Sequence, residues 1–168
     1  MDRIVLVGLP GTGKTTVGRA LSLAVHRGFY DTDEVFAERE RESVADFLRR
    51  EGEARFRERE LDALTSALER AGVVATGGGI VVSEAAREVL AREFTLWLDC
   101  GDETLLRRVG EGDRPLLGER PAQRLGELRR ERTEWYRQVS RHRVDTDREV
   151  DDVVGDLVRL VEREDARS

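Results

Sequence analysis

The sequence is poor in several residue types, and each shortage excludes a class of protein. Asparagine is absent, and Lys14 is the only lysine among 29 basic residues. Without asparagine the chain cannot form the Asn-Lys-x-Asp motif that reads guanine in nucleotide switches. It also lacks the asparagine that holds a second magnesium ion in the catalytic loop of protein kinases. N-glycosylation has no acceptor residue.

Cysteine and long apolar runs are scarce as well. Cys100 is the only cysteine, so no intramolecular disulfide can form. This cysteine content is consistent with a protein of the reducing cytosol. No basic residue near it in sequence would lower the pKa of its thiol, so we expect it to be unreactive. No apolar run approaches the 18 residues of a membrane span. We therefore expect a soluble, cytoplasmic protein without a membrane partner.

Charge and length limit the possibilities further. Charged residues make up 38% of the chain, and the formal net charge is −6. A negative net charge is the wrong sign for a protein that coats nucleic acid or an anionic membrane. Anionic ligands would have to be held by local clusters of arginine. The length of 168 residues predicts one domain, over 1–168.

Short β-branched runs alternate with helical patterns along the chain. The patterns predict strands near 4–7, 28–30, 73–75, 94–98 and 142–145. They predict helices over 14–26, 53–68, 83–90, 102–109, 121–139 and 150–161, and a short helix opened by a capping box at Ser43. This alternation indicates an α/β fold with a parallel sheet and helices on both faces.

The segment Gly8-Leu9-Pro10-Gly11-Thr12-Gly13-Lys14-Thr15 fits the phosphate-loop motif G-x-x-x-x-G-K-[ST]. Glycines let backbone N–H groups turn inward around phosphate oxygens, and the following helix adds its positive N-terminal dipole. The ammonium of Lys14 would neutralise the β- and γ-phosphates, and the Thr15 hydroxyl would ligate magnesium. An ammonium is a compact point charge, whereas a guanidinium is a planar fork. The sequence therefore predicts a nucleotide site that depends on the single lysine.

Asp31-Thr32-Asp33 follows the second predicted strand, at the edge where open α/β sheets bind ligands. One carboxylate could face the metal and the other a substrate hydroxyl. Alternatively, the segment is a helix N-cap followed by acidic first-turn residues. The pattern alone leaves both interpretations open.

Several other segments are candidates for ligand contact. Phe56-Arg57 lies in a run of arginine and glutamate that otherwise suggests a solvated helix face. Three successive glycines, 77–79, come directly after a strand and allow close approach of a ligand. Arg114-Pro115-Leu116-Leu117 follows a glycine-broken segment and predicts a mobile lid whose arginine arrives on closure.

Other residues fit structural roles better. Asp99 ends a strand as the acid of a Walker B motif does, but an acid there is also an ordinary helix-entry cap. His26 and His142 lack metal-ligand spacing, and Trp97 alternates with two leucines as a strand-packing residue. We expect none of them to bind a ligand.

Together, the motifs resemble those of the shikimate kinase family, within the nucleoside-monophosphate-kinase-like group of P-loop folds. They occur in order as G-x-x-G-x-G-K-T-T at 8–16, D-T-D at 31–33, F-R at 56–57, G-G-G at 77–79 and R-P-L-L at 114–117. The resemblance runs from about residue 3 to about residue 160. It implies a three-layer α/β/α P-loop kinase with a central parallel five-stranded sheet and a mobile lid at about 110–120.

The resemblance also implies an activity and a set of site residues. The activity is ATP-dependent phosphorylation of the 3-hydroxyl of shikimate, a step of chorismate and aromatic amino acid biosynthesis, with Mg²⁺ as cofactor. We separately expect a monomer, although the sequence itself does not determine the oligomeric state. The residues implied for ATP are Gly11, Thr12, Gly13, Lys14, Thr15, Thr16, Arg108 and Arg114. Those implied for shikimate are Asp33, Arg57, Gly78, Gly79 and Arg132. Thr15 would ligate the metal, Asp31 would reach it through water, and Lys14, Asp33 and Arg114 would be catalytic.

The chain departs from the family pattern in three places. Arg132-Thr133-Glu134-Trp135-Tyr136 stands where the family usually reads R-x-P-L-Y, which places an acid near Arg132. The segment between Arg108 and Arg114 is short, and it is open which residue of 145–149 flanks adenine.

Two other functions remain as alternatives. One is another small-molecule kinase of this fold, acting on gluconate or a nucleoside monophosphate. The other is a nucleotide-binding regulatory module without phosphotransfer, against which Arg114 argues.

Overall fold

The computed structural model describes residues 2–110 and 120–167. Arg114 and almost all of the predicted lid lie outside the described residues. The elements below are those of this described part of the chain.

Five parallel strands form one sheet, as predicted. They are β1 (Arg3–Val7), β2 (Gly28–Asp31), β3 (Gly72–Ala75), β4 (Phe94–Asp99) and β5 (His142–Asp145). Their order in the sheet is β2-β3-β1-β4-β5, and every neighbouring pair is parallel. Such a sheet is covered on both faces, which explains why its central strands are continuous apolar runs.

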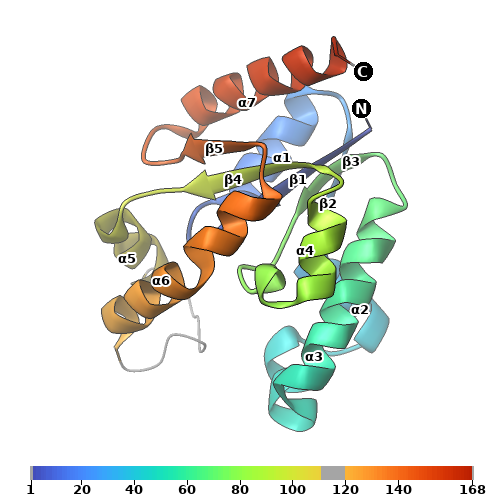
Figure 1. Cartoon of the computed structure of the whole chain (residues 1–168), viewed down its shortest axis with the longest axis vertical. Helices are drawn as coiled ribbons and strands as arrows, with labels where there is room; N and C mark the ends of the chain where they lie inside the picture. Colours follow the sequence, from blue (N-terminus) through green and yellow to red (C-terminus); the bar gives the residue numbers. More distant parts are fainter. Residues whose placement is uncertain (1, 111–119, 168) are drawn as a thin grey trace.

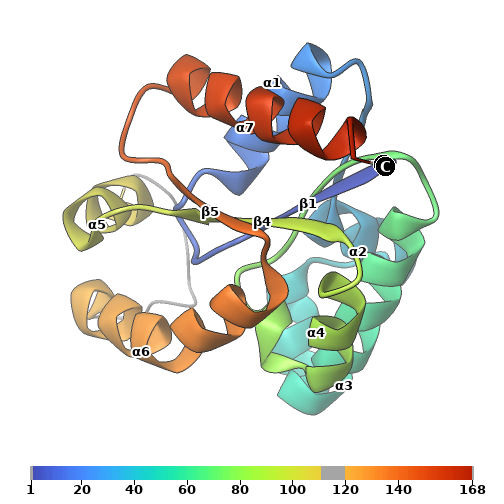
Figure 2. The same cartoon turned by 45° about the horizontal axis from the view of Figure 1, so that its top comes forward.

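Helices cover both faces of this sheet (Figure 1). The helices α1 (Lys14–Ala24) and α7 (Val150–Asp165) lie together on one face. The other face carries α3 (Val44–Leu68), α4 (Glu84–Leu90), α5 (Asp102–Gly110) and α6 (Pro121–Val139). The turned view in Figure 2 separates these two layers across the edge of the sheet. The three-layer α/β/α architecture is therefore confirmed.

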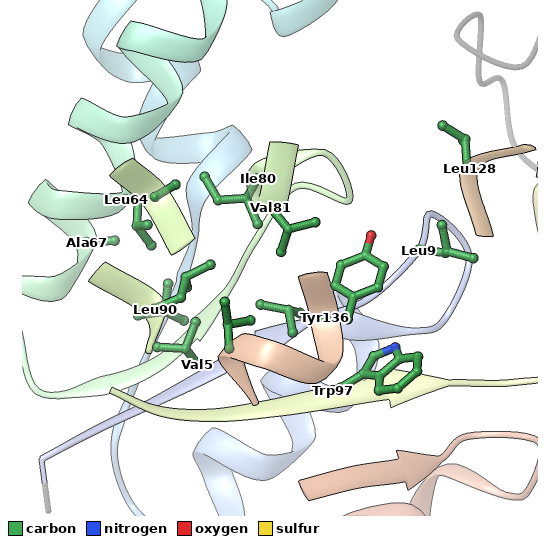
Figure 3. Close-up of a cluster of buried hydrophobic side chains, with 14 of the residues drawn as sticks. Val5, Leu9, Leu64, Ala67, Ile80, Val81, Leu90, Trp97, Leu128 and Tyr136 are labelled. Atoms are coloured by element: carbon green, nitrogen blue, oxygen red, sulfur yellow. The ribbon is translucent and has the colours of Figure 1, made fainter. Parts of the chain in front are cut away.

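Alternation along the strands assigns side chains to two cores. On β1, Val5 and Val7 pack toward α3, α4 and α6, whereas Ile4 and Leu6 pack toward α1 and α7, as the two-residue period of a strand requires. Figure 3 shows part of the first core, where the ring of Trp97 stacks on that of Tyr136 at 5.9 Å between centroids. The packing role predicted for Trp97 is confirmed.

The structure corrects the predicted elements between β2 and β4. Residues Thr32–Glu40 form a helix, α2, whose start was only one of two interpretations of Asp31–Asp33. The apolar spacing did not predict it, because charged residues interrupt that spacing. The short helix expected at Ser43 and the helix from 53 are halves of α3, separated by Gly52 with φ of 80°. A short 3-10 helix, η1 (Ile80–Val82), follows the three glycines. Phe36, Phe47 and Phe56 join α2 to α3 in a small core of their own.

The parallel arrangement brings five strand ends to one edge of the sheet. The phosphate-loop motif follows β1, the Asp31–Asp33 segment spans the end of β2 and the start of α2, and the three glycines follow β3. Ligands of open α/β sheets bind at this edge. Within residues 2–110 and 120–167, no helix is both long and apolar enough to cross a membrane.

Candidate active site

The phosphate loop joins β1 to α1 in the backbone conformation that its glycines allow. Gly11 and Gly13 have φ of 89° and 90°, in the left-handed region where glycine is favoured. Gly13 is the N-cap residue of α1, so the loop N–H groups and the first turn of the helix face the same space. Such a turn is suited to hold phosphate oxygens.

Lys14 lies inside this loop rather than on the surface. Its side chain is 8% exposed, and its Nζ donates to the carbonyl oxygens of Gly8 at 2.8 Å and Leu9 at 2.9 Å. The lone ammonium of the chain is therefore held against the loop backbone. Three donors on one compact charge fit this enclosure, whereas a planar guanidinium would need more room.

The two carboxylates after β2 take different positions. Asp31 caps α2, since its Oδ1 accepts a hydrogen bond from the N–H of Asp33 at 3.0 Å. Its Oδ2 accepts from the hydroxyl of Thr15 at 2.8 Å. Asp31 thus does both things that the sequence left open: it caps the helix and it faces the phosphate loop. Asp33 points instead toward the glycine segment, where its Oδ1 would lie 3.0 Å from a Cβ added at Gly77.

Arg108 of α5 lies over the phosphate loop. Its Nη1 donates to the carbonyl oxygen of Gly11 at 3.4 Å, and its Nη2 to that of Thr146 at 2.8 Å. A pocket of about 320 Å³ opens here between the phosphate loop and the segment after β5. Thr146, Arg148 and Val150 line it together with residues of the phosphate loop.

Arg57 of α3 and Arg132 of α6 converge on the three glycines. A Cβ added at Gly79 would lie 2.6 Å from Arg57 Nη1, so only glycine allows the guanidinium to sit this close. Arg132 is 9% exposed, and its Nη1 donates to the carbonyl oxygen of Gly78 at 2.9 Å. The structure therefore brings together Asp33, both arginines and the glycine segment, which come from four separate parts of the chain.

Both arginines keep a hydrogen-bond donor unused. The Nε atoms of Arg57 and Arg132 are buried and lack a partner among the residues that the structure describes. A buried polar atom without a partner is unusual in a stable protein. Guanidinium groups prefer planar anions such as carboxylates, so this arrangement is suited to a small carboxylate ligand.

Glu60 is a site residue that the sequence did not reveal. It is 4% exposed, and its carboxylate accepts from Arg57 Nη1 at 2.7 Å. Burial raises the pKa of Glu60 to about 7, with Arg57 opposing the rise and Asp33 adding to it. In sequence Glu60 is one of many glutamates in a charged run, and only its spacing of three residues from Arg57 marks it. Tyr136 was missed in the same way; its hydroxyl donates to the carbonyl oxygen of Gly78 at 2.5 Å.

The unusual Glu134 and Trp135 turn away from the site. Glu134 is exposed and pairs with Arg137 rather than with Arg132. The ring of Trp135 lies 4.9 Å from the guanidinium carbon of Arg87. Arg87 in turn donates to the carbonyl oxygens of η1. The acid therefore does not compete for Arg132.

Asp99, Cys100 and the two histidines have the following surroundings in the structure, and no cap by Asp99 at the start of α5 is seen among the described residues. Asp99 is 2% exposed and pairs with Arg129 at 2.9 Å and Arg143 at 2.8 Å, so the latter two neutralise it. Cys100 is buried, and burial raises the pKa of its thiol although Arg108 lies nearby and opposes the rise. His26 and His142 are exposed. None of the four belongs to the site.

A nucleotide loop at the carboxyl edge of a three-layer parallel sheet, facing a small anion site, defines a P-loop kinase of small molecules. Comparisons with known proteins narrow this class. A family model described as "Shikimate kinase" matches residues 10–162. A shikimate kinase of Symbiobacterium thermophilum is 44% identical over 95% of this chain and 97% of its own length. The chain therefore belongs to the shikimate kinase family, and its activity is that of an enzyme that phosphorylates shikimate.

Solved structures agree with this assignment. Shikimate kinase from Acinetobacter baumannii, determined in complex with shikimate, superposes with a TM-score of 0.91 at 33% identity. The match covers 98% of this chain and 94% of that chain. A gluconokinase from Sinorhizobium meliloti superposes with a TM-score of 0.65 at 22% identity over 99% of this chain and 97% of its own, which shows a shared fold alone. The gluconate alternative is therefore not favoured.

Proposed function

We propose that the chain transfers the γ-phosphoryl group of ATP to the 3-hydroxyl of shikimate at the carboxyl edge of the sheet, and that individual residues have the following roles. Residues 11–16 would hold the phosphates, and Arg108 would lie against adenine. Lys14 would neutralise the β- and γ-phosphates during transfer. The buried position of its ammonium, bonded to two loop carbonyl oxygens, supports this role.

Thr15 and Asp31 are the residues that would hold Mg²⁺. Their oxygens lie 2.8 Å apart, and hydroxyl and carboxylate oxygens are the ligands that this hard cation prefers. When bound, the ion would neutralise charge on the phosphate oxygens. Thr15 would contact the ion directly, and Asp31 would hold a water of its shell.

Asp33 would position the reacting hydroxyl and accept its proton. This carboxylate lies beside Gly77 and close enough to Glu60 to raise the pKa of that group. A group that takes a proton from an attacking hydroxyl must lie within hydrogen-bond reach of it. Its place beside the glycine segment and near Glu60, which pairs with Arg57, supports this role.

The observation that carries the proposal is the convergence of Arg57 and Arg132 on the glycine segment. Each has a buried Nε–H without a partner among the described residues. The shikimate carboxylate would accept hydrogen bonds from these guanidinium groups and from the N–H groups of Gly78 and Gly79. Two guanidinium forks select a planar anion.

The remaining parts of the proposal concern the chain as a whole. Residues 1–168 would act as a single kinase domain and as a monomer in the cytoplasm. Arg114 would close over the transferring phosphoryl group, and the segment at about 110–120 would exclude water from the site on closure.

ADP release should be compared side by side with shikimate, gluconate, CMP and AMP as acceptors. We expect turnover with shikimate alone. Turnover with a nucleoside monophosphate and none with shikimate would overturn the proposal. ATP binding without turnover on any acceptor would instead indicate a regulatory module.

A further inference from the structure

We propose that a basic hollow beside α6, away from the substrate site, binds a small anion with two or more anionic oxygen groups. The hollow has a volume of about 390 Å³ and is lined in part by Trp97, Asp99, Arg129, Arg137, Arg141 and Arg143. We call it the arginine hollow. It lies where α6 meets the start of β5 and the carboxyl half of β4.

The charge of the arginine hollow is opposite to that of the protein. Four arginines and one carboxylate line it, although the chain carries a net charge of −6. Arg129 and Arg143 pair with Asp99 from two sides, and Arg129 also pairs with the exposed Asp102, so the uncompensated charge lies on the outer arginines, Arg137 and Arg141. Locally concentrated positive charge on an acidic protein attracts anions and little else.

The two outer arginines, Arg137 and Arg141, carry positive charge that buried carboxylates do not neutralise. Arg137 pairs with Glu134, and both of these side chains are exposed. Arg141 is exposed, and its guanidinium forms no ion pair with any residue in the described ranges. A multivalent anion would therefore meet an uncompensated guanidinium and could also draw Arg137 from its surface partner, whose attraction is screened by solvent.

A neighbouring hollow provides an internal contrast. It shares Arg129 and Arg143 with the arginine hollow, but its carboxylates are Asp102, Asp145 and Asp147. There the acids outnumber the arginines, so an anion is repelled. Arg129 and Arg143 thus lie between the arginine hollow, which is basic, and its neighbour, which is acidic. Only the arginine hollow suits an anionic ligand.

Trp97 forms part of the wall. It is 5% exposed, and the guanidinium carbon of Arg143 lies 5.1 Å from its ring centroid. Its indole Nε1 is buried and has no hydrogen-bond partner within the described residues. The ring also stacks on that of Tyr136, so Trp97 borders the hollow as a reporter of binding and not as a direct ligand contact.

The arginine hollow is separate from the substrate site although both use α6. Arg129 and Arg137 lie on one stripe of the helix, and Arg132 and Tyr136 lie on the adjacent stripe, where both donate to the carbonyl oxygen of Gly78. An anion in the hollow would therefore not contact the residues assigned to shikimate.

Fluorescence of Trp97 provides a direct test. The chain has two tryptophans, so a Trp135→Phe background leaves Trp97 as the only reporter. Inorganic pyrophosphate and citrate would be titrated as phosphate and carboxylate probes, with saturating ADP and shikimate present to suppress anion binding at the substrate sites. We expect a saturable change with at least one probe, and its apparent affinity should fall as ionic strength rises.

Two double variants distinguish a built site from net charge. Arg137→Gln/Arg141→Gln should weaken binding by about tenfold or more. Arg39→Gln/Arg163→Gln removes the same charge from exposed positions on α2 and α7 and should leave binding unchanged. If the first pair fails to fold, as judged by circular dichroism, Arg141→Gln alone replaces it. The absence of a saturable change with either probe, or an equal loss in both double variants, would overturn the proposal.

Discussion

The phosphate side and the acceptor side of the site are built in opposite ways. The heart of the phosphate side is one contiguous segment, 8–16, whose groups are largely backbone N–H groups and one lysine. The acceptor side is assembled from side chains of α2, α3 and α6 around the glycines after β3. The geometry of a contiguous loop is set by the backbone conformation of neighbouring residues. The geometry of an assembled site depends on the packing of every helix that contributes a side chain to it.

Because of this difference, we expect the largest loss of turnover from a substitution on the phosphate side that changes the shape of the Lys14 side chain but keeps its charge. Lys14→Arg should lower kcat by about a thousandfold or more, because the enclosure formed by the carbonyl oxygens of Gly8 and Leu9 fits an ammonium. ADP release with shikimate measures this. Arg39→Lys, the reverse exchange at an exposed position on α2, should have no effect. Near-normal turnover in Lys14→Arg would mean that charge alone suffices.

Asp33→Ala tests whether the acceptor side can fail while the phosphate side still works. Turnover should fall by roughly a hundredfold or more, the usual range for loss of a positioned base, while ATP affinity stays nearly intact. Glu34→Ala is the matched control, since the adjacent Glu34 pairs with Arg19 on the surface. Loss of ATP binding in Asp33→Ala would point to a metal or folding role instead.

The buried carboxyl of Glu60 should make the acceptor side sensitive to pH. Its pKa is raised from 4.5 to about 7 in the folded chain, so between these values the folded state holds a proton that the unfolded state releases. Stability contributed at this position is therefore present at low pH and lost as pH rises through the window. Between about pH 5 and pH 8 the free energy of unfolding should fall by roughly 2 kcal/mol more in the wild type than in Glu60→Gln.

Urea unfolding at both pH values measures this difference. Glu58→Gln is the control on the same helix, because Glu58 is exposed and pairs with Arg55. We expect its stability to follow that of the wild type at both pH values. A wild type and a Glu60→Gln variant with parallel pH profiles would show that Glu60 stays ionised.

The smallest expected effect comes from crowding one arginine. A Cβ at Gly79 would lie 2.6 Å and 2.7 Å from the two terminal nitrogens of Arg57, so Gly79→Ala must displace the guanidinium. The KM for shikimate should rise by about tenfold, with the KM for ATP unchanged. Gly155→Ala is the control on α7, where an added Cβ would meet only Arg159 at 3.8 Å. Equal changes in both KM values would contradict the separation of the two sides.

Much of the fold was predictable because apolar runs and glycine breaks are local signals. All five strands and most of the helices that flank them were predicted, but α2 was suggested only by the possible N-cap at Asp31. Its apolar residues meet the phenylalanines of α3 in a small core of their own, and charged residues mask this pattern in the sequence. Candidate site residues were predictable where a sequence motif is itself associated with one kind of ligand, as the phosphate-loop motif is at Lys14. It was not predictable at Glu60 or Tyr136, which resemble many other residues of their types.

The sequence by itself determined the phosphate loop, the parallel α/β architecture and the place of the single lysine, because these depend on neighbours within a few residues. The resemblance to a family named Arg57 and Arg132 as candidates, but only the tertiary structure showed that the two guanidinium groups meet at the same glycine segment. Arg57 and Arg132 differ from the surface arginines in burial and in their contact with the glycine segment. Burial is a property of packing between distant elements, since desolvation and hydrogen bonding depend on what lies across the site.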